Sequence, residues 1–215
     1  MDALLGADER ALLRRLNSPQ KIQDFLDTLP INFEENGETY MSPRRTLREK
    51  KAHCLEGALL AAAALAYHGG RPMLMDIQTA PDDEDHVVTL FKQHGRWGAI
   101  SKTNHAILRY RDPVYLSVRE LALSYFNEYF LESGRKTMRA YSKPFSLSSY
   151  PLHSWLTSEE DLGWIAQAID DVPHFPIADA KNYRVLRKAD SLERIAMLQT
   201  EWSEPAIYRA RYIAE

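Results

Sequence analysis

The first apolar positions of the 215-residue chain recur at helical spacing. Residues 7–17 predict a short helix, after which Ser18 and Pro19 supply an N-cap followed by proline at the first helical position. The next apolar residues lie at i, i+3, i+4 and i+7, as Ile22, Phe25, Leu26 and Leu29. This spacing predicts an amphipathic helix that Pro30 closes, and the polar residues 32–42 predict a loop after it.

A run of strong helix formers extends from Leu55 to Tyr67 and ends at the pair Gly69 and Gly70. The only cysteine of the chain, Cys54, therefore lies at the N-terminus of a helix. Unpaired backbone N–H groups and the helix dipole stabilise a thiolate there, lowering the thiol pKa from roughly 8.5 into a reactive range. Cys54 is a candidate nucleophile, although inert packing is the commoner fate of a lone cysteine and stays open as an alternative.

After Gly70 the hydrophobic pattern changes from helical to extended. Residues 72–77 form a short apolar run with a proline near its start, which is typical of a strand. An acidic loop over residues 81–85 precedes the β-branched run His86–Phe91, and a turn at residues 93–96 leads to a returning strand at 97–101. These signals predict a β-hairpin with His86 at the mouth of its first strand.

The rest of the chain is less regular. Asp112 and Pro113 predict the start of one helix through Phe130, while residues 144–155 leave strand and loop undecided. Thr157-x-x-Glu160 has the form of a capping box, and it predicts a helix carrying Leu162, Ile165, Ala166 and Ile169. A last helix is expected from about residue 191 to residue 200, followed by a tail without clear period.

These elements predict an α+β protein in a single domain over residues 1–215. Its core is expected over about residues 20–140, with N-terminal helices, including the Cys54 helix, packed on a small antiparallel sheet. A helical extension is expected over about residues 141–215.

Composition narrows the function classes. Hydrophobic residues make up 45% of the chain and charged residues 27%, and the net charge of −3 gives no reason to expect nucleic acid as a partner. The longest apolar run, Ala58–Tyr67, is about half of the roughly 20 residues that a membrane span needs. A single cysteine excludes an internal disulfide, and without a signal-like N-terminal run a cytoplasmic setting is expected.

No metal or cofactor is expected either. The seven histidines show no tight pair at the spacing of zinc ligands, and no second cysteine can complete such a site. The acidic loop Asp82–Asp85 offers oxygen ligands for calcium but lacks the glycine and the spaced acids of an EF-hand loop. The oligomeric state is left open by the sequence.

A thiolate nucleophile needs a base within hydrogen-bond reach, and the base needs a third group to orient it. His86 follows Cys54 by 86 − 54 = 32 residues. A helix, a turn, a strand and a loop of that total length bring the chain back beside the N-terminus of the helix. The order of elements therefore predicts that His86 faces Cys54.

At this point the chain resembles the transglutaminase-like superfamily of cysteine enzymes. The resemblance rests on the pattern Cys54-x-x-Gly57-Ala58-x-Leu60, a Gly-Gly helix end before a strand, His86-Val87-Val88, and Gly95-Arg96-Trp97. It covers about residues 20–105. It implies a papain-like α+β core in which Cys, His and an acidic or amide residue carry out acyl transfer.

Carried over to this sequence, the resemblance implies Cys54 as nucleophile and His86 as base. The third position falls near Ser101, where the family usually has aspartate. A serine hydroxyl accepts a hydrogen bond from an imidazole N–H but offers no charge to stabilise imidazolium. Asn104, three residues further on, is the alternative orienting residue.

Two other features bear on the site. His53 is expected to point away from Cys54 and to act as a surface or capping residue. Five basic residues just upstream predict a solvated face that can also favour the thiolate: Arg44, Arg45, Arg48, Lys50 and Lys51.

Three hypotheses follow. The first is a cysteine enzyme acting on a peptide, a protein or a small amide through a thioester on Cys54. The second is a peptide- or protein-binding module that keeps the same fold without efficient catalysis, and the third is a protein whose Cys54 is only packed.

Overall fold

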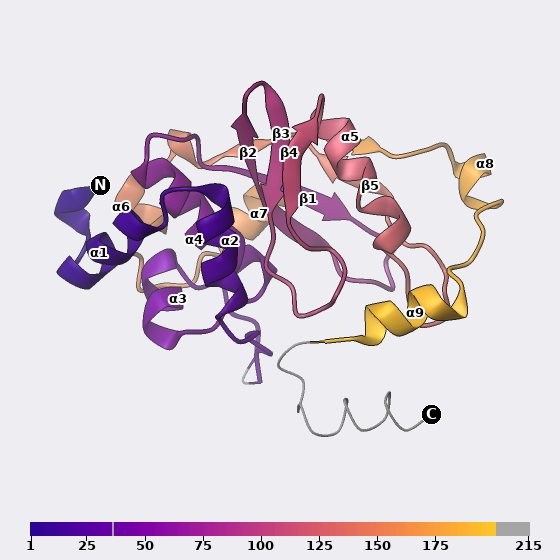
Figure 1. Cartoon of the computed structure of the whole chain (residues 1–215), viewed down its shortest axis with the longest axis horizontal. Helices are drawn as coiled ribbons and strands as arrows, with labels where there is room; N and C mark the ends of the chain where they lie inside the picture. The colour runs from indigo at the N-terminus through magenta and orange to yellow at the C-terminus, as the bar shows by residue number, and fades with distance from the viewer. Residues whose placement is uncertain (36, 201–215) are drawn as a thin grey trace.

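The computed structural model describes residues 1–35 and 37–200, and it is a mixed α+β structure. Within these residues seven strands form one sheet, and every strand pair in it is antiparallel. Figure 1 shows the N-terminal helices gathered on one side of the sheet and α5 on the other. No helix of the described residues is both long and apolar enough to cross a membrane.

The sheet has the order β4-β3-β2-β1-β5-β7, and β6 also pairs with β1. In chain order the strands are β1 (Met73–Gln78), β2 (His86–Gln93), β3 (Arg96–Ile100), β4 (Arg111–Tyr115), β5 (Ala140–Ser142), β6 (Phe145–Ser146) and β7 (His174–Pro176). The expected hairpin is the β2–β3 pair, whose turn holds Gly95 at a φ of 81°. His86 opens β2 and lies opposite Ile77 of β1.

Three short helices precede the Cys54 helix. They are α1 (Ala7–Arg15), α2 (Pro19–Asp27) and α3 (Pro43–Glu49), after a 3-10 turn at Asp2–Leu4. The Ser18 hydroxyl caps α2 by accepting from the Lys21 amide at 3.3 Å, as the Ser-Pro pair predicts. The sequence analysis did not predict α3, which begins with a second Ser-Pro pair, Ser42 and Pro43.

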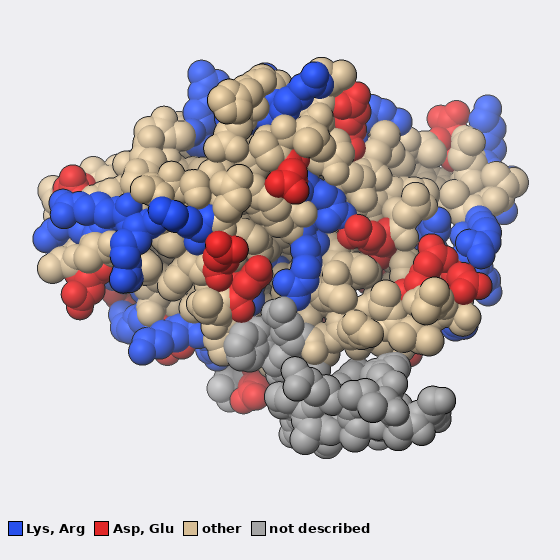
Figure 2. Space-filling view, viewed as in Figure 1, with Lys and Arg blue, Asp and Glu red and all other residues tan. Residues whose placement is uncertain are grey.

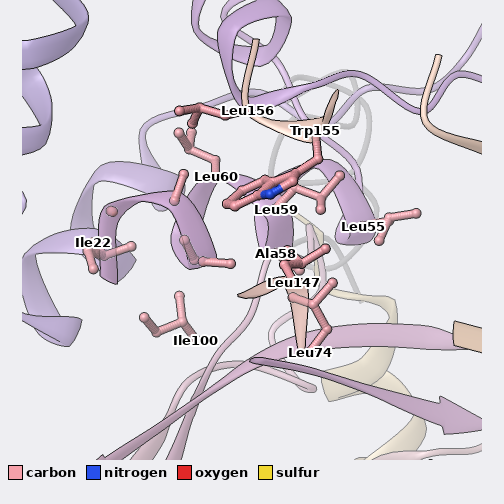
Figure 3. Packing of buried hydrophobic residues seen from close by; sticks show 14 of the residues in the cluster. Ile22, Leu55, Ala58, Leu59, Leu60, Leu74, Ile100, Leu147, Trp155 and Leu156 are labelled. Carbon is pink, nitrogen blue, oxygen red and sulfur yellow. The ribbon is translucent and has the colours of Figure 1, made fainter. Parts of the chain in front are cut away.

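Helix α4 (Cys54–Tyr67) is the central helix of the fold. Its residues from Leu55 to Ala64 are all buried, which explains why apolar side chains occur around its whole circumference. The Thr89 hydroxyl of β2 donates to the Ala58 carbonyl at 2.6 Å and ties this helix to the sheet. Figure 3 shows Trp155 packed beside Leu59 and Leu60 of α4.

Alternate residues of the central strands enter two separate apolar clusters. Leu74 and Phe91 pack with the N-terminal helices and α4, whereas Met75 and Leu90 pack on the opposite side with residues of α5 (Val118–Leu123). Side chains alternate between the faces of a strand, so both faces of the sheet are covered. This accounts for the continuous apolar runs in β1 and β2.

One helix prediction is wrong, and the predicted start of another is wrong. Residues 112–130 do not form one helix: Asp112 and Pro113 lie in β4, and α5 begins only after the Ser117 cap. Strand β4 is at the edge of the sheet, where a proline without an N–H is tolerated. Thr157 and Glu160 likewise form no capping box, because the predicted helix begins at Gly163 with Leu162 as its N-cap.

The C-terminal third returns to the sheet through β5, β6 and β7. Its helices are α6 (Leu152–Trp155), α7 (Gly163–Asp170), α8 (Ala180–Tyr183) and α9 (Ser191–Leu198), with 3-10 turns at Phe126–Glu128 and Leu147–Ser149. Helix α9 matches the expected last helix, and Asp190 and Glu193 form its capping box. The tail after residue 200 lies outside the described residues.

Candidate active site

Cys54 is half-buried at the first position of α4, where two cavities meet. We call the first, of about 600 Å³, the acidic cavity because seven carboxylates line it. They are Glu34, Glu38, Asp76, Asp83, Glu84, Asp85 and Asp170, and the lining includes no lysine or arginine. The second, of about 540 Å³, is the mixed cavity, lined by His86, Lys102 and apolar side chains such as Tyr129 and Phe130. A group bound in either cavity therefore reaches the sulfur.

The structure brings His86 and Ser101 together beside Cys54. His86 Nε2 lies 2.8 Å from Ser101 Oγ, and Ser101 Oγ donates its own proton to the Leu108 carbonyl at 2.6 Å. Because the hydroxyl proton is used there, Ser101 accepts from a protonated Nε2. The other ring nitrogen of His86, Nδ1, is left for the Cys54 thiol, whose pKa the imidazole lowers.

Both backbone polar groups of Ser101, its N–H and its carbonyl, are hydrogen-bonded to one side chain. The Gln23 side chain of α2 donates to the Ser101 carbonyl at 2.8 Å and accepts from the Ser101 amide at 2.9 Å. Gln23 is buried, and it lies 101 − 23 = 78 residues from Ser101 in the chain. In the sequence Gln23 is only a polar residue on an amphipathic helix, so no local signal could have identified this role.

Asn104 takes a different place from Ser101. It lines the mixed cavity together with Cys54 and His86, but within the described residues it makes no hydrogen bond to the His86 ring. Ser101 is thus the residue that contacts the ring nitrogen away from the sulfur. The catalytic roles of Cys54, His86, Ser101 and Asn104 stay predictions.

Lys102 is a buried cation near the start of α4. Its ammonium donates to the carbonyls of Leu26 and Leu29, at the end of α2. A Cβ on Gly57 would lie 2.3 Å from the Lys102 Cβ, so only glycine permits this approach. The glycine of the Cys54-x-x-Gly57 pattern is therefore required by packing beside the site.

His53 does not point away from Cys54 as expected, although it does cap the helix. Its Nδ1 lies 3.2 Å from the Leu55 amide, from which it accepts when the ring is neutral, and its Nε2 donates to the Thr39 carbonyl at 2.7 Å. Its imidazole also lowers the pKa of the Cys54 thiol. Two imidazoles, one at the helix start and one on β2, thus act on the same thiol.

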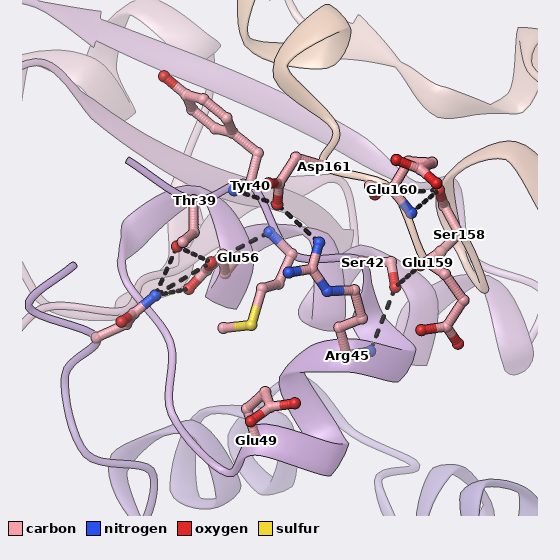
Figure 4. Close-up of polar contacts among 12 residues, drawn as sticks. Thr39, Tyr40, Ser42, Arg45, Glu49, Glu56, Ser158, Glu159, Glu160 and Asp161 are labelled. Carbon is pink, nitrogen blue, oxygen red and sulfur yellow. Dashed lines mark hydrogen bonds and ion pairs between the residues drawn. The ribbon is translucent and has the colours of Figure 1, made fainter. Parts of the chain in front are cut away.

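Glu56 lies one helical turn beyond His53 and is fully buried. Its carboxylate accepts from the Met41 amide, the side-chain amide of Asn32 and the hydroxyl of Thr39 (Figure 4), and also from the His53 amide, at 2.9–3.3 Å. Hydrogen bonds from so many donors offset the desolvation of this buried carboxylate. The carboxylate lies beside His53, whose Nε2 is 3.5 Å from Glu56 Oε1.

The electrostatics of the thiol favour the thiolate. Burial by itself raises the pKa of Cys54, but hydrogen bonds and charge from His53 and His86 outweigh it and lower the pKa to about 5. Burial likewise lowers the pKa of His53, yet the Cys54 sulfur, the Glu56 carboxylate and the Thr39 carbonyl together raise it to about 9. Between about pH 5 and 9 the thiolate and an imidazolium therefore coexist.

The basic residues upstream of Cys54 do not reach it. Arg44, Arg45 and Arg48 belong to α3 and pair with Glu9, Asp161 and Glu159. Figure 4 shows the Arg45–Asp161 pair, and none of the five basic residues lines either cavity at Cys54. Figure 2 shows lysine and arginine side chains at the end of the molecule that α1–α3 form in Figure 1 and elsewhere on the same face. The arginines of α3 are thus paired with carboxylates and not with the thiol.

The acidic loop before β2 folds toward the site. Asp85 accepts from the amide and the hydroxyl of Thr79, at 2.7 and 2.9 Å, while Asp83 accepts from the Thr137 hydroxyl. These bonds hold the loop against β1 and the segment before β5. Asp83, Glu84 and Asp85 consequently line both cavities.

In the acidic cavity, Asp76 of β1 is buried, and its Oδ2 lies 3.1 Å from His174 Nε2. Burial and the neighbouring Asp85 carboxylate raise the pKa of Asp76 to about 7. Burial and Asp85 also raise the pKa of Asp170. The sequence analysis missed this carboxyl group, because in the sequence Asp76 is a single polar residue inside an apolar strand.

Comparison with known proteins adds no family: the chain matches no protein-family model and no curated protein.

Proposed function

We propose that the protein is a cysteine enzyme that cleaves or transfers an amide bond through a thioester on Cys54. The observation that supports this most is the arrangement of three residues: Cys54 and His86 line one cavity, His86 lowers the pKa of the Cys54 thiol, and His86 Nε2 lies 2.8 Å from Ser101 Oγ. A nucleophile, a base and an orienting group in this order are what acyl transfer by a thiol requires. The resemblance to the transglutaminase-like superfamily supports the same chemistry.

In the first half-reaction the Cys54 thiolate attacks the amide carbonyl carbon, the C–N bond breaks and the amine leaves with one proton. In the second, His86 takes a proton from water or from an acceptor amine, which attacks the thioester and releases the thiolate. Within the described residues the Cys54 backbone N–H has no acceptor. It is the donor at the helix start that can stabilise the oxyanion.

The substrate class follows from the two cavities. They meet at Cys54, so an extended amide places one substituent in the acidic cavity and the other in the mixed cavity. A peptide or protein segment fits this arrangement, and so does a small amide.

The test uses p-nitrophenyl acetate, an activated acyl donor that needs no knowledge of the substrate. We expect one equivalent of p-nitrophenolate in a burst, and an intact mass one acetyl group heavier, assigned to Cys54. Cys54→Ala should give neither. His86→Ala should still be acetylated but should lose the acetyl group at least about tenfold more slowly, because the base for deacylation is absent.

A binding module of the same fold is the second candidate, and Ser101 in place of an acid is the observation that favours it. In that case the wild-type protein forms the acetyl thioester and keeps it, with no turnover. A folded protein that shows no burst, and whose thiol is not alkylated below pH 8.5, would instead have a packed cysteine, and the enzyme proposal would be wrong. Repeating the alkylation at high salt separates contributions from exposed charges, which salt screens.

A further inference from the structure

The two imidazoles at Cys54 have different surroundings. His53 Nε2 lies 2.7 Å from the Thr39 carbonyl, 3.5 Å from Glu56 Oε1 and 3.9 Å from Glu34 Oε1. Three oxygens, two of them from carboxylates, thus surround one N–H of His53. Such surroundings stabilise a positive charge on the ring.

His86 has a neutral partner instead. Its Nε2 donates to the Ser101 hydroxyl, which can neither carry charge nor donate back, since its proton goes to Leu108. Within the described residues no carboxylate lies within ion-pair distance of the His86 ring. Ser101 fixes the tautomer of a neutral imidazole, and it offers nothing that stabilises an imidazolium.

Other charged groups face the two rings from several elements. They are Cys54 and Glu56 on α4, Glu34, Glu38 and Tyr40 in the preceding loop, Asp83, Glu84 and Asp85 before β2, and Lys102 after β3. Apart from Lys102, the ionisable side chains on this list carry negative charge or none. These negatively charged side chains favour a cation near the thiol, but none of them can itself supply the positive charge.

We propose, on the basis of the function proposed above, that His53 is the main cationic partner of the Cys54 thiolate and that His86 is the base of the second half-reaction. Glu56 and Glu34 then provide for His53 what an aspartate provides for the base in papain-like sites. The division explains how Ser101 can occupy the third position: with the main positive charge on His53, His86 needs orientation more than a counter-charge.

The proton steps balance with this division. When the thiolate attacks and the C–N bond breaks, the leaving amine takes the proton from the His53 imidazolium. His53 Nδ1 is then free to accept from the Leu55 amide, the contact seen at 3.2 Å. In the second half-reaction His86 takes a proton from the attacking water or amine. Transfer of that proton to His53 restores the starting state.

The test compares the pH dependence of Cys54 alkylation by iodoacetamide in three variants. His53→Asn keeps an oxygen that can accept from the Leu55 amide but cannot carry charge, and we expect its midpoint to rise by about two pH units. His86→Ala should shift the midpoint by less than about one unit. His68→Asn, at the other end of α4, is the matched control and should behave as wild type.

Nitrogen-15 NMR of the histidine rings gives a second measurement that requires no variant at position 53. In the wild-type protein at pH 7.5 we expect one ring, assigned to His53, to be doubly protonated and the His86 ring to be the Nε2–H tautomer. Glu34→Gln should lower the titration midpoint of His53 and leave the fold intact, since Glu34 lies in an exterior loop.

The outcomes separate the two proposals. If His86→Ala raises the midpoint and His53→Asn does not, or if the doubly protonated ring is His86, the assignment of charge to His53 is overturned while the cysteine-enzyme proposal stands. If the wild-type midpoint is near the roughly 8.5 of a free thiol, both proposals fail.

Discussion

Replacing Ser101 by alanine removes one hydroxyl that links two buried groups. Ser101 is 1% exposed and His86 6% exposed, so the His86 Nε2–H and the Leu108 carbonyl would both lose a partner away from bulk water. A buried polar group left unpaired costs about 1–3 kcal/mol. The cavity lets water reach the ring, so the lower half of the summed range applies, and we expect a loss of about 2–4 kcal/mol.

The free energy of unfolding is measured by urea denaturation followed by tryptophan fluorescence, since Trp155 is buried in the core. Ser154→Ala is the matched control: its hydroxyl donates to the Pro151 carbonyl at 2.8 Å on the surface of α6, and we expect a loss below about 1 kcal/mol. Nitrogen-15 NMR at pH 8 should show the His86 ring as a mixture of tautomers in Ser101→Ala. A loss within about 0.5 kcal/mol, with a single Nε2–H tautomer retained, would refute the orienting role of Ser101.

Ser101→Asp is a different perturbation. It places a carboxylate where the Ser101 hydroxyl now donates to the Leu108 carbonyl at 2.6 Å. Two acceptors would then face each other in a buried site, which costs more than the loss of one bond. The structure therefore predicts that the Ser101→Asp protein is less stable than the Ser101→Ala protein at pH 8. In the Ser101→Asp protein the new carboxylate favours the positive charge on His86 over that on His53.

Two further predictions concern packing and charge beside the site. Gly57→Ala places a Cβ 2.3 Å from the Lys102 Cβ, and we expect it to destabilise the protein by about 1–3 kcal/mol or more in urea denaturation. The control Ala58→Gly introduces no such clash, and its cost is about 1 kcal/mol of helix propensity plus the lost methyl contacts. Asp76→Asn removes a carboxyl group whose pKa is raised to about 7 from 3.8, so the stability that this group contributes in the protonated form is lost as the pH rises through 7. The variant should accordingly gain about 1–2 kcal/mol over wild type between pH 5 and pH 8, and an unchanged difference across that range would contradict the burial of this charge.

The elements that could be predicted are those set by local pattern. Helix α4, the β2–β3 hairpin and the Ser18 cap follow from spacing, turn glycines and capping residues within a few positions of each other. Helix α3 was missed because the basic residues of this seven-residue segment were interpreted as a solvated face and not as part of a helix. Strand β4 was mistaken for a helix because an Asp-Pro pair has the same local meaning at a helix start and at a sheet edge, and only the sheet order distinguishes them.

The candidate site divides in the same way. The order of helix and hairpin predicts that Cys54, His86 and Ser101 lie near one another, and their contacts in the structure agree with that order, while their catalytic role stays a prediction. Gln23 could not be found, since its partner is 78 residues away. The environment of His53 could not be found either, because the Thr39 carbonyl approaches it from a loop without periodicity.

The charge around Cys54 explains why the position of the imidazolium matters. The thiol lies between cavities lined by carboxylates, and like charges nearby disfavour a thiolate. The helix N-terminus contributes only a partial charge, and the arginines of α3 pair elsewhere. A pKa of about 5 at Cys54 therefore depends on a full positive charge in contact with the sulfur. Of the two rings in contact, His53 has carboxylates behind it and His86 has a hydroxyl, so the structure provides for that charge on the residue that directly precedes the nucleophile.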